Sequence, residues 1–224
     1  ELTVRKAKAG EQIHALDGSY YELGPEDTVI SSGERVASLA GIIGGMHSGC
    51  EKDTTDVFLE SAYFDSIAIA KTGRKLRINS DARYRFERGV DPLFVEQGID
   101  LATQLILDIC GGEVSHLVEA GQTPNVEKEL ILRPDRVDCL VGMKIPRKEQ
   151  ERILKALGFE VVDNNNLLIV KVPSWRPDIF GEADLIEEIV RVTSLEKLQG
   201  VPLKKTQRGV MKPVLTAFQK RISR

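Results

Sequence analysis

The chain has 224 residues, of which 42% are hydrophobic and 29% are charged, and its formal net charge at pH 7 is −3. This composition is typical of one or two globular domains, and its small negative charge excludes a uniformly basic, histone-like nucleic-acid binder. No apolar run approaches the roughly 20 residues of a membrane-spanning helix, and no secretory signal begins the chain.

The first 30 residues are predicted to form strands. Residues 13–16 and 20–23 flank the dipeptide Asp17-Gly18, which tolerates the positive φ angles of a tight hairpin turn. A second turn is expected at residues 24–27. Residues 36–49 are small and glycine-rich, and they predict a loop whose backbone approaches another group closely.

Residues 57–64 form an apolar run in which Glu60 is the only charged residue, and the run predicts a buried strand. An ionised carboxylate buried in an apolar strand is costly unless it is paired or its pKa rises. Two interpretations follow. Glu60 forms a salt bridge to a nearby arginine, or it lies in a pocket and accepts a hydrogen bond from a ligand hydroxyl or amine.

A basic segment follows at residues 71–88. It holds seven lysines and arginines but only two acids, namely Lys71, Arg74, Lys75, Arg77, Arg83, Arg85, Arg88, Asp81 and Glu87. A solvated surface is one interpretation. The other is contact with a nucleic-acid backbone, because such cations position phosphates without reading sequence.

The dipeptide Asp91-Pro92 predicts the start of a helix that ends before Gly111-Gly112. Its apolar residues recur at helical spacing, so this helix is expected to close the core of the first domain. The polar, turn-rich residues 121–125 then indicate a domain boundary.

The second half of the chain has shorter units. A strand is predicted at residues 130–132, a helix between Pro134 and Gly142, a helix at 147–157, and two strands around residues 164–166. The order of helix, helix and hairpin resembles a winged-helix module. The expected fold class is therefore α+β, with domains at residues 1–123 and 124–200 and a basic linker at 201–224.

A last helix is predicted at residues 182–192, and acids crowd its start: Asp178, Glu182, Asp184, Glu187 and Glu188. Acids in a first helical turn are favoured by the helix dipole, so simple capping is one interpretation. The alternative is an all-oxygen site for Mg²⁺.

Three groups of motifs, in this order and spacing, resemble the B3/B4 domain of the bacterial phenylalanyl-tRNA synthetase beta subunit. They are Ala40-Gly41-Ile42-Ile43-Gly44-Gly45, Leu59-Glu60-Ser61-Ala62-Tyr63-Phe64 and Tyr84-Arg85-Phe86-Glu87-Arg88-Gly89-Val90-Asp91-Pro92. Residues 172–178 and 184–188 are similar to the B5 domain of the same subunit.

This resemblance implies an aminoacyl-tRNA synthetase that joins phenylalanine to tRNA(Phe) using ATP. It also implies a cytoplasmic assembly of two alpha and two beta subunits, with the aminoacylation site on alpha. The B3/B4 domain of the family hydrolyses mischarged tyrosyl-tRNA(Phe). By position, Glu60 would bind the tyrosine phenol, Ser80 and Ala82 would line the pocket, and Gly44 would form part of its wall.

No catalytic residue is evident in this chain. Family members carry an upstream histidine motif that this chain lacks, so we expect a piece of a longer polypeptide with an incomplete editing site. The cysteines are odd in number and widely separated, namely Cys50, Cys110 and Cys139, which also favours a reducing cytoplasm.

For the B5 domain, the resemblance implies Mg²⁺ bound by Asp178, Asp184, Glu187 and Glu188 at the contact with the alpha subunit. The alternative for the whole chain is a scaffold without chemistry, either a nucleic-acid-binding module or a subunit interface. No membrane partner is expected.

Overall fold

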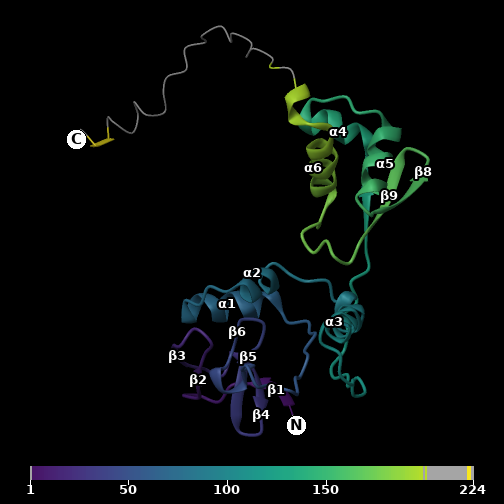
Figure 1. The fold of residues 1–224 in the computed structure, drawn as a ribbon. Coiled ribbons are helices and arrows are strands. Elements are labelled where there is room, and N and C mark those ends of the chain that lie inside the picture. The colour runs from purple at the N-terminus through teal and green to yellow at the C-terminus, as the bar shows by residue number, and fades with distance from the viewer. Residues whose placement is uncertain (1, 199, 201–220, 223–224) are drawn as a thin grey trace.

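The computed structural model describes residues 2–198, 200 and 221–222 (Figure 1). Helices and strands are mixed along the chain, so the predicted α+β class is confirmed. Two separate hydrophobic clusters define an N-terminal unit, residues 2–110, and a C-terminal unit, residues 128–198. The predicted basic linker at 201–224 lies outside the described residues, apart from 221–222.

The N-terminal unit contains an antiparallel sheet in the order β1-β4-β5-β6 and a hairpin of β2 and β3. The bounds of these strands are β1 (Leu2–Lys6), β2 (Gln12–His14), β3 (Tyr20–Glu22), β4 (Thr28–Ser32), β5 (Arg35–Leu39) and β6 (Ile43–Gly44). The predicted hairpin is confirmed, and Gly18 has the positive φ of +82° that its turn requires.

The predicted loop at residues 36–49 is partly wrong. Residues 36–39 belong to β5, where Val36 and Leu39 are buried, and a short helix η1 (Met46–Ser48) follows β6. The glycines begin only at Gly41, so the preceding apolar residues are free to pair as a strand.

Helix α1 (Ser66–Leu76) is attached to the sheet through a buried carboxylate. Asp27, which is 1% exposed, accepts hydrogen bonds from Lys75 Nζ at 2.6 Å and Thr72 Oγ1 at 2.9 Å, both on α1. It also accepts from the backbone N–H of Gly24 at 2.8 Å, which closes the predicted turn at 24–27. One side chain therefore fixes a turn and a helix together.

Two expectations for the N-terminal unit are wrong. Residues 57–64 are extended but have no strand partner among the described residues, and Phe58 is 75% exposed. Helix α3 (Phe94–Cys110) begins two residues after Pro92 and buries none of its residues, so it does not close the core. An apolar pattern favours burial, but it does not specify the partner that would provide it.

The C-terminal unit follows the predicted order closely. Its elements are β7 (Lys128–Leu132), α4 (Pro134–Val141), α5 (Arg147–Ala156), β8 (Glu160–Asn164), β9 (Leu167–Val172), α6 (Glu182–Thr193) and the short η2 (Leu195–Lys197). The strands form an antiparallel sheet in the order β7-β9-β8. Helix α4 starts at Pro134 and ends at Gly142 (φ +75°), as predicted.

The core of the C-terminal unit lies between its sheet and its helices. Leu168 of β9, Ile153 of α5 and Ile189 of α6 are at most 1% exposed and belong to one hydrophobic cluster. No helix in the described ranges is both long and apolar enough to cross a membrane. The three cysteines are exposed and unpaired.

Candidate functional site

Glu60 lies on the extended segment between η1 and α1. The segment is held by two residues that follow Glu60. Ser61 Oγ donates a hydrogen bond to the carbonyl of Val95 in α3 at 2.8 Å, and Phe64 packs against Phe86 with ring centroids 5.4 Å apart. Glu60 is thus positioned by its neighbours rather than by a sheet.

The carboxylate of Glu60 is uncommitted. Its residue surface is exposed, so the predicted burial in a strand is wrong, and the predicted salt bridge to an arginine is not formed with any described residue. Neighbouring protein atoms still exclude enough water to raise the pKa of Glu60 above the ordinary glutamate value. The group is an available acceptor that is harder to ionise than a free glutamate.

The turn at residues 40–42, between β5 and β6, contacts this segment at Gly41. Gly41 has φ +66°, and a Cβ placed there would lie 3.0–3.2 Å from side-chain atoms of Ile69, Phe64 and Phe86. Any larger residue would therefore push the turn away from α1 and from the segment that carries Glu60. The glycine is required by both backbone conformation and close packing.

Ser80 connects the same turn to α2 (Asp81–Phe86). Its Oγ donates to the carbonyl of Ile42 at 2.6 Å and accepts from the N–H of Arg83 at 3.1 Å, so it caps α2. Gly44 lies two residues beyond Ile42 in β6, where its carbonyl accepts from the Leu16 N–H at 2.9 Å. The structure therefore connects Ser80 to the turn that leads into β6 and Gly44.

Ala82 is exposed on the first turn of α2. No hydrogen bond or ion pair among the described residues joins Glu60 to the turn or to α2, and its connection to them runs through Phe64. The sequence placed Arg83 in the basic segment but did not predict its structural role in α2, where it donates to the carbonyl of Ile78 and pairs with Glu87 at 3.0 Å. Its only sequence signal is the Arg83–Glu87 spacing of four residues.

The basic segment divides into engaged and free cations. Lys75 pairs with Asp27, Arg83 pairs with Glu87, and Arg88 lies 3.6 Å from the ring centroid of Tyr84. The remaining four are exposed and form no ion pair within the described residues: Lys71, Arg74, Arg77 and Arg85. About half of the cluster is thus available to a partner.

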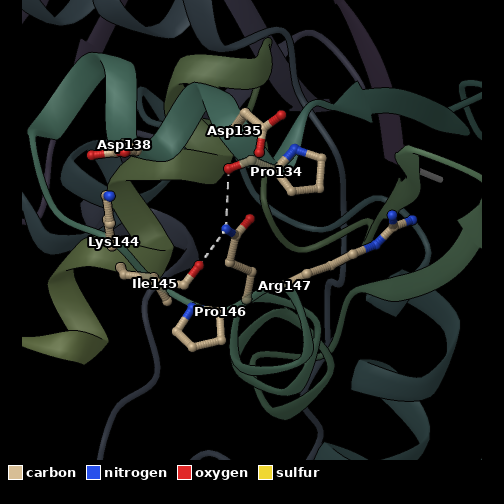
Figure 2. Close-up of a pocket in the computed structure, with 8 residues that line it drawn as sticks. Pro134, Asp135, Asp138, Lys144, Ile145, Pro146 and Arg147 are labelled. Carbon is tan, nitrogen blue, oxygen red and sulfur yellow. Dashed lines mark hydrogen bonds between the residues drawn. The ribbon is translucent and has the colours of Figure 1, made fainter.

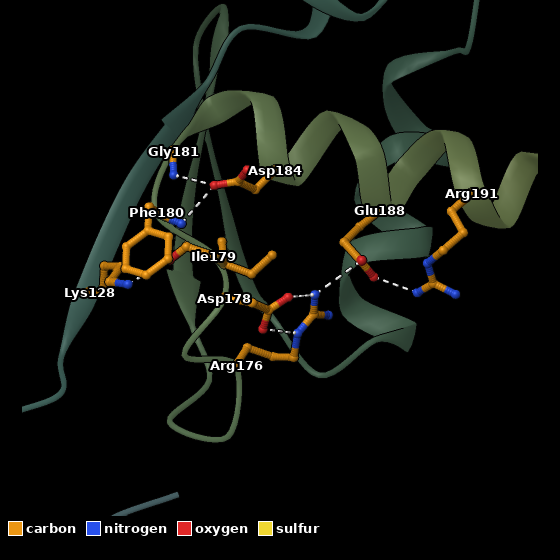
Figure 3. Close-up of polar contacts among 9 residues, drawn as sticks. All are labelled: Lys128, Arg176, Asp178, Ile179, Phe180, Gly181, Asp184, Glu188 and Arg191. Carbon is orange, nitrogen blue, oxygen red and sulfur yellow. Dashed lines mark hydrogen bonds and ion pairs between the residues drawn. The ribbon is translucent and has the colours of Figure 1, made fainter. Parts of the chain in front are cut away.

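The acids of the C-terminal unit surround an arginine (Figure 3). Arg176 binds Asp178 through two hydrogen bonds of 2.6 and 2.9 Å, and its Nη2 also lies 3.1 Å from Glu188 Oε1. Glu188 is 7% exposed and pairs with Arg191 at 2.5 Å as well. Hydrogen bonds from Arg176 lower the pKa of both acids, and those acids raise the pKa of Arg176.

The other two predicted metal ligands are used differently. Asp184 Oδ2 accepts from the N–H groups of Phe180 and Gly181 at 2.8 and 2.9 Å, which caps α6. Glu187 is exposed on the same helix and lines a groove with Leu140 and Ala183. Capping, the simpler interpretation of these acids, accounts for Asp184.

This arrangement does not fit one Mg²⁺ ion held by all four acids. Arg176 already supplies the positive charge between Asp178 and Glu188, and the described residues contain no group of three acidic, histidine or cysteine side chains placed to hold a metal. The Mg²⁺ assignment stays a prediction from the resemblance.

Comparisons with known proteins identify both units. Residues 1–111 match the B3/4 domain family, and residues 130–194 match the tRNA synthetase B5 domain family. The chain is 54% identical over 220 residues to the phenylalanine–tRNA ligase beta subunit of Cereibacter sphaeroides and 52% identical over 222 residues to that of Ruegeria pomeroyi. These alignments cover 98% and 99% of this chain but 27% of each relative, so the chain spans about a quarter of their length.

Among solved structures, an N-terminal fragment of the phenylalanyl-tRNA synthetase beta subunit from Pyrococcus horikoshii matches 84% of this chain and 55% of its own. The sequence identity is 16% and the TM-score is 0.40.

Proposed function

We propose, because this chain belongs to the phenylalanine–tRNA ligase beta-subunit family, that its B3/4 region is part of a site that hydrolyses tyrosyl-tRNA(Phe). In this proposal residues 1–123 form the editing domain and residues 124–200 form a B5 domain that supports assembly with the alpha subunit. The complete cytoplasmic ligase uses ATP and Mg²⁺, and aminoacylation takes place on alpha.

The observation that carries the proposal is the uncommitted carboxylate of Glu60. An editing site must accept tyrosine and reject phenylalanine, which differ by one hydroxyl. A site built to hydrogen-bond a hydroxyl rejects the analogue that lacks it by about 10⁴- to 10⁵-fold, because its own polar group would then stay unpaired. Glu60 has no competing ion pair among the described residues and can accept the phenol O–H.

The residues around the glycine-rich turn have supporting roles. Ser80 holds the turn to α2 through its bond to Ile42, and this fixes the turn before Gly44 relative to Ala82 of α2. Ala82 is small, which leaves room for an aromatic ring. A water adds to the ester carbonyl, the bond from that carbonyl to the tRNA 3′ oxygen breaks, and a proton from the water passes to this oxygen, which releases tyrosine and tRNA with a free hydroxyl. We assign no general base to this transfer.

The four free cations of the basic segment, defined above, favour a role in holding the tRNA backbone. Phosphate contacts of this type position nucleic acid without specifying sequence, so they would deliver the acceptor end rather than select it. The same observation favours the second candidate, a nucleic-acid-binding or subunit-interface scaffold without hydrolysis.

The test uses the intact ligase carrying Glu60→Ala, with Glu34→Ala as the matched control on an exposed turn of the same unit. We expect Glu60→Ala to reduce tyrosyl-tRNA(Phe) deacylation by about 10- to 150-fold while phenylalanine activation is unchanged, because a lost charge-assisted hydrogen bond is worth about 1.5–3 kcal/mol and is here the selective contact. Ala82→Trp should block deacylation by filling the pocket.

The editing proposal would be refuted if Glu60→Ala lost deacylation and phenylalanine activation equally. It would also be refuted if Glu60→Ala and Ala82→Trp both left deacylation unchanged. Salt-sensitive tRNA binding without any deacylation would favour the scaffold instead.

A further inference from the structure

The segment at residues 57–64 carries Glu60 outside any sheet, so few contacts fix its path. Within the described part of the chain, its one hydrogen bond runs from Ser61 Oγ to the carbonyl of Val95 in α3, at 2.8 Å. Its other anchor is the apolar packing of Phe64 against Phe86 of α2. Because apolar packing is non-directional, the Ser61 bond is the directional contact that fixes this segment.

Helix α3 approaches Ser61 closely along one helical turn. Ser61 is half-buried, and a Cβ placed at Gly98, three residues after Val95, would lie 3.5 Å from Ser61 Oγ. Since α3 buries none of its own residues, packing alone holds it only weakly to the N-terminal unit. The Ser61–Val95 bond therefore joins two elements that have few other attachments.

Glu60 precedes Ser61 in the chain and does not fix its own position. Its carboxylate forms no hydrogen bond or ion pair with any described residue. A group that must meet one hydroxyl of a substrate has to be held in place, because a misplacement of about 1 Å can cost about 100-fold in rate. The position of the Glu60 carboxylate must therefore come from the backbone of its neighbours.

We propose that Ser61 is a positioning residue for Glu60: its bond to Val95 holds the backbone from which the carboxylate extends, so that the carboxylate meets the tyrosine hydroxyl at a fixed place. This inference rests on the proposed function. The Ser61 hydroxyl itself is directed to α3, so it acts through Glu60 and not on the substrate.

The test compares Ser61→Ala with Ser61→Thr in the intact ligase. Ser61→Ala should reduce tyrosyl-tRNA(Phe) deacylation by about 2- to 12-fold, the equivalent of one neutral hydrogen bond, while phenylalanine activation is unchanged. Ser61→Thr retains the hydroxyl donor and should keep a rate close to that of the parent. Ser115→Ala removes an exposed serine hydroxyl beyond α3 and is the matched control, which should leave deacylation unchanged.

The double variant Glu60→Ala/Ser61→Ala distinguishes positioning from a general effect on stability. If Ser61 acts through Glu60, adding Ser61→Ala to Glu60→Ala causes no further loss of deacylation, because the carboxylate that it positions is already absent.

A second readout does not depend on hydrolysis. Carboxyl ¹³C NMR of this chain should show the raised pKa of Glu60 falling toward the ordinary glutamate value in Ser61→Ala, because a released segment admits water to the carboxylate. In Ser61→Thr the pKa of Glu60 should stay raised.

Three results would overturn the proposal and leave the editing function intact. They are additive losses in the double variant, equal losses of deacylation in Ser61→Ala and Ser61→Thr, and a Ser61→Ala variant in which either deacylation or the pKa of Glu60 is unchanged. Unchanged deacylation in Glu60→Ala would instead refute the proposed function, and this inference with it.

Discussion

Glu188 in the C-terminal unit and Glu60 in the N-terminal unit are both glutamates next to apolar residues, yet only Glu188 has cationic partners. Arg176 and Arg191 lie 3.1 and 2.5 Å from its oxygens and lower its pKa, whereas water exclusion without a partner raises the pKa of Glu60. A paired carboxylate serves the fold, since its charge is already satisfied. An unpaired carboxylate with a raised pKa is available to a ligand and is therefore a candidate for function.

The largest effect is expected when Arg176, one of the two partners of Glu188, is replaced. Arg176→Met leaves the buried carboxylate with Arg191 alone, and we expect the C-terminal unit to lose about 1.5–3 kcal/mol of unfolding free energy. The single tryptophan of the chain, Trp175, lies in this unit, so fluorescence-detected urea unfolding reports on it selectively.

The control for that variant is Arg152→Met, which breaks an exposed pair with Glu149. Its effect should stay within about 0.5 kcal/mol. Equal losses for the two arginine variants would show that burial of Glu188 does not matter.

The N-terminal unit also contains a paired carboxylate, Asp27, so a paired and an unpaired carboxylate can be compared within one unit. Asp27→Asn weakens the bonds to Lys75 and Thr72, and we expect a loss of about 1–3 kcal/mol. Hydrogen exchange of α1 amides measures this loss. Asp53→Asn, at an exposed position without a side-chain partner among the described residues, is the control and should change exchange little.

Acid titration distinguishes paired carboxylates by the pH at which their stabilisation disappears. A bidentate hydrogen bond from Arg5 lowers the pKa of Glu11 to about 2. Its contribution is therefore complete above the unfolded pKa near 4.3 and is lost as pH falls toward 2. Between pH 6 and pH 3, the parent chain should lose about 1–2 kcal/mol more unfolding free energy than Glu11→Gln. Urea unfolding at both pH values, followed by hydrogen exchange, measures this difference.

If the pH dependence of the N-terminal unit were the same with and without Glu11, the Arg5–Glu11 pair would have no role in stability.

The smallest expected effect belongs to Glu60. Because no described residue pairs with it, Glu60→Gln should change the stability of the N-terminal unit by no more than about 0.5 kcal/mol. A loss comparable to that of Asp27→Asn would mean that Glu60 has a structural partner. Hydrogen exchange of α3 and α2 amides reports on the two contacts made by the residues after Glu60, namely Ser61 with Val95 and Phe64 with Phe86.

The two units also differ in how much of their structure could be predicted from the sequence. In the C-terminal unit, local signals sufficed, because Pro134 and Gly142 mark the ends of α4 and the hairpin order follows from short, separated segments. In the N-terminal unit, the run at 57–64 and the stripe on α3 predicted burial, but burial needs a partner from elsewhere in the chain. Local patterns contain no information about that partner.

The candidate sites show the same limit. The sequence identified Glu60 as an unusual charge and grouped Asp178 with Glu188, but it did not show that Arg176 lies between the two acids. Likewise, nothing in the sequence distinguishes Gln150 from a surface glutamine until its amide is seen bound to two carbonyls at the cavity between α4 and α5 (Figure 2).

The most direct test of the contrast between Glu60 and Glu188 is a carboxyl ¹³C NMR titration of this chain, in which both glutamates are measured in one sample. The account predicts that Glu60 titrates above the ordinary glutamate pKa of about 4.3 and Glu188 below it. Coincident titration of the two groups, or the reverse order, would contradict the assignment of Glu188 to the fold and of Glu60 to a ligand.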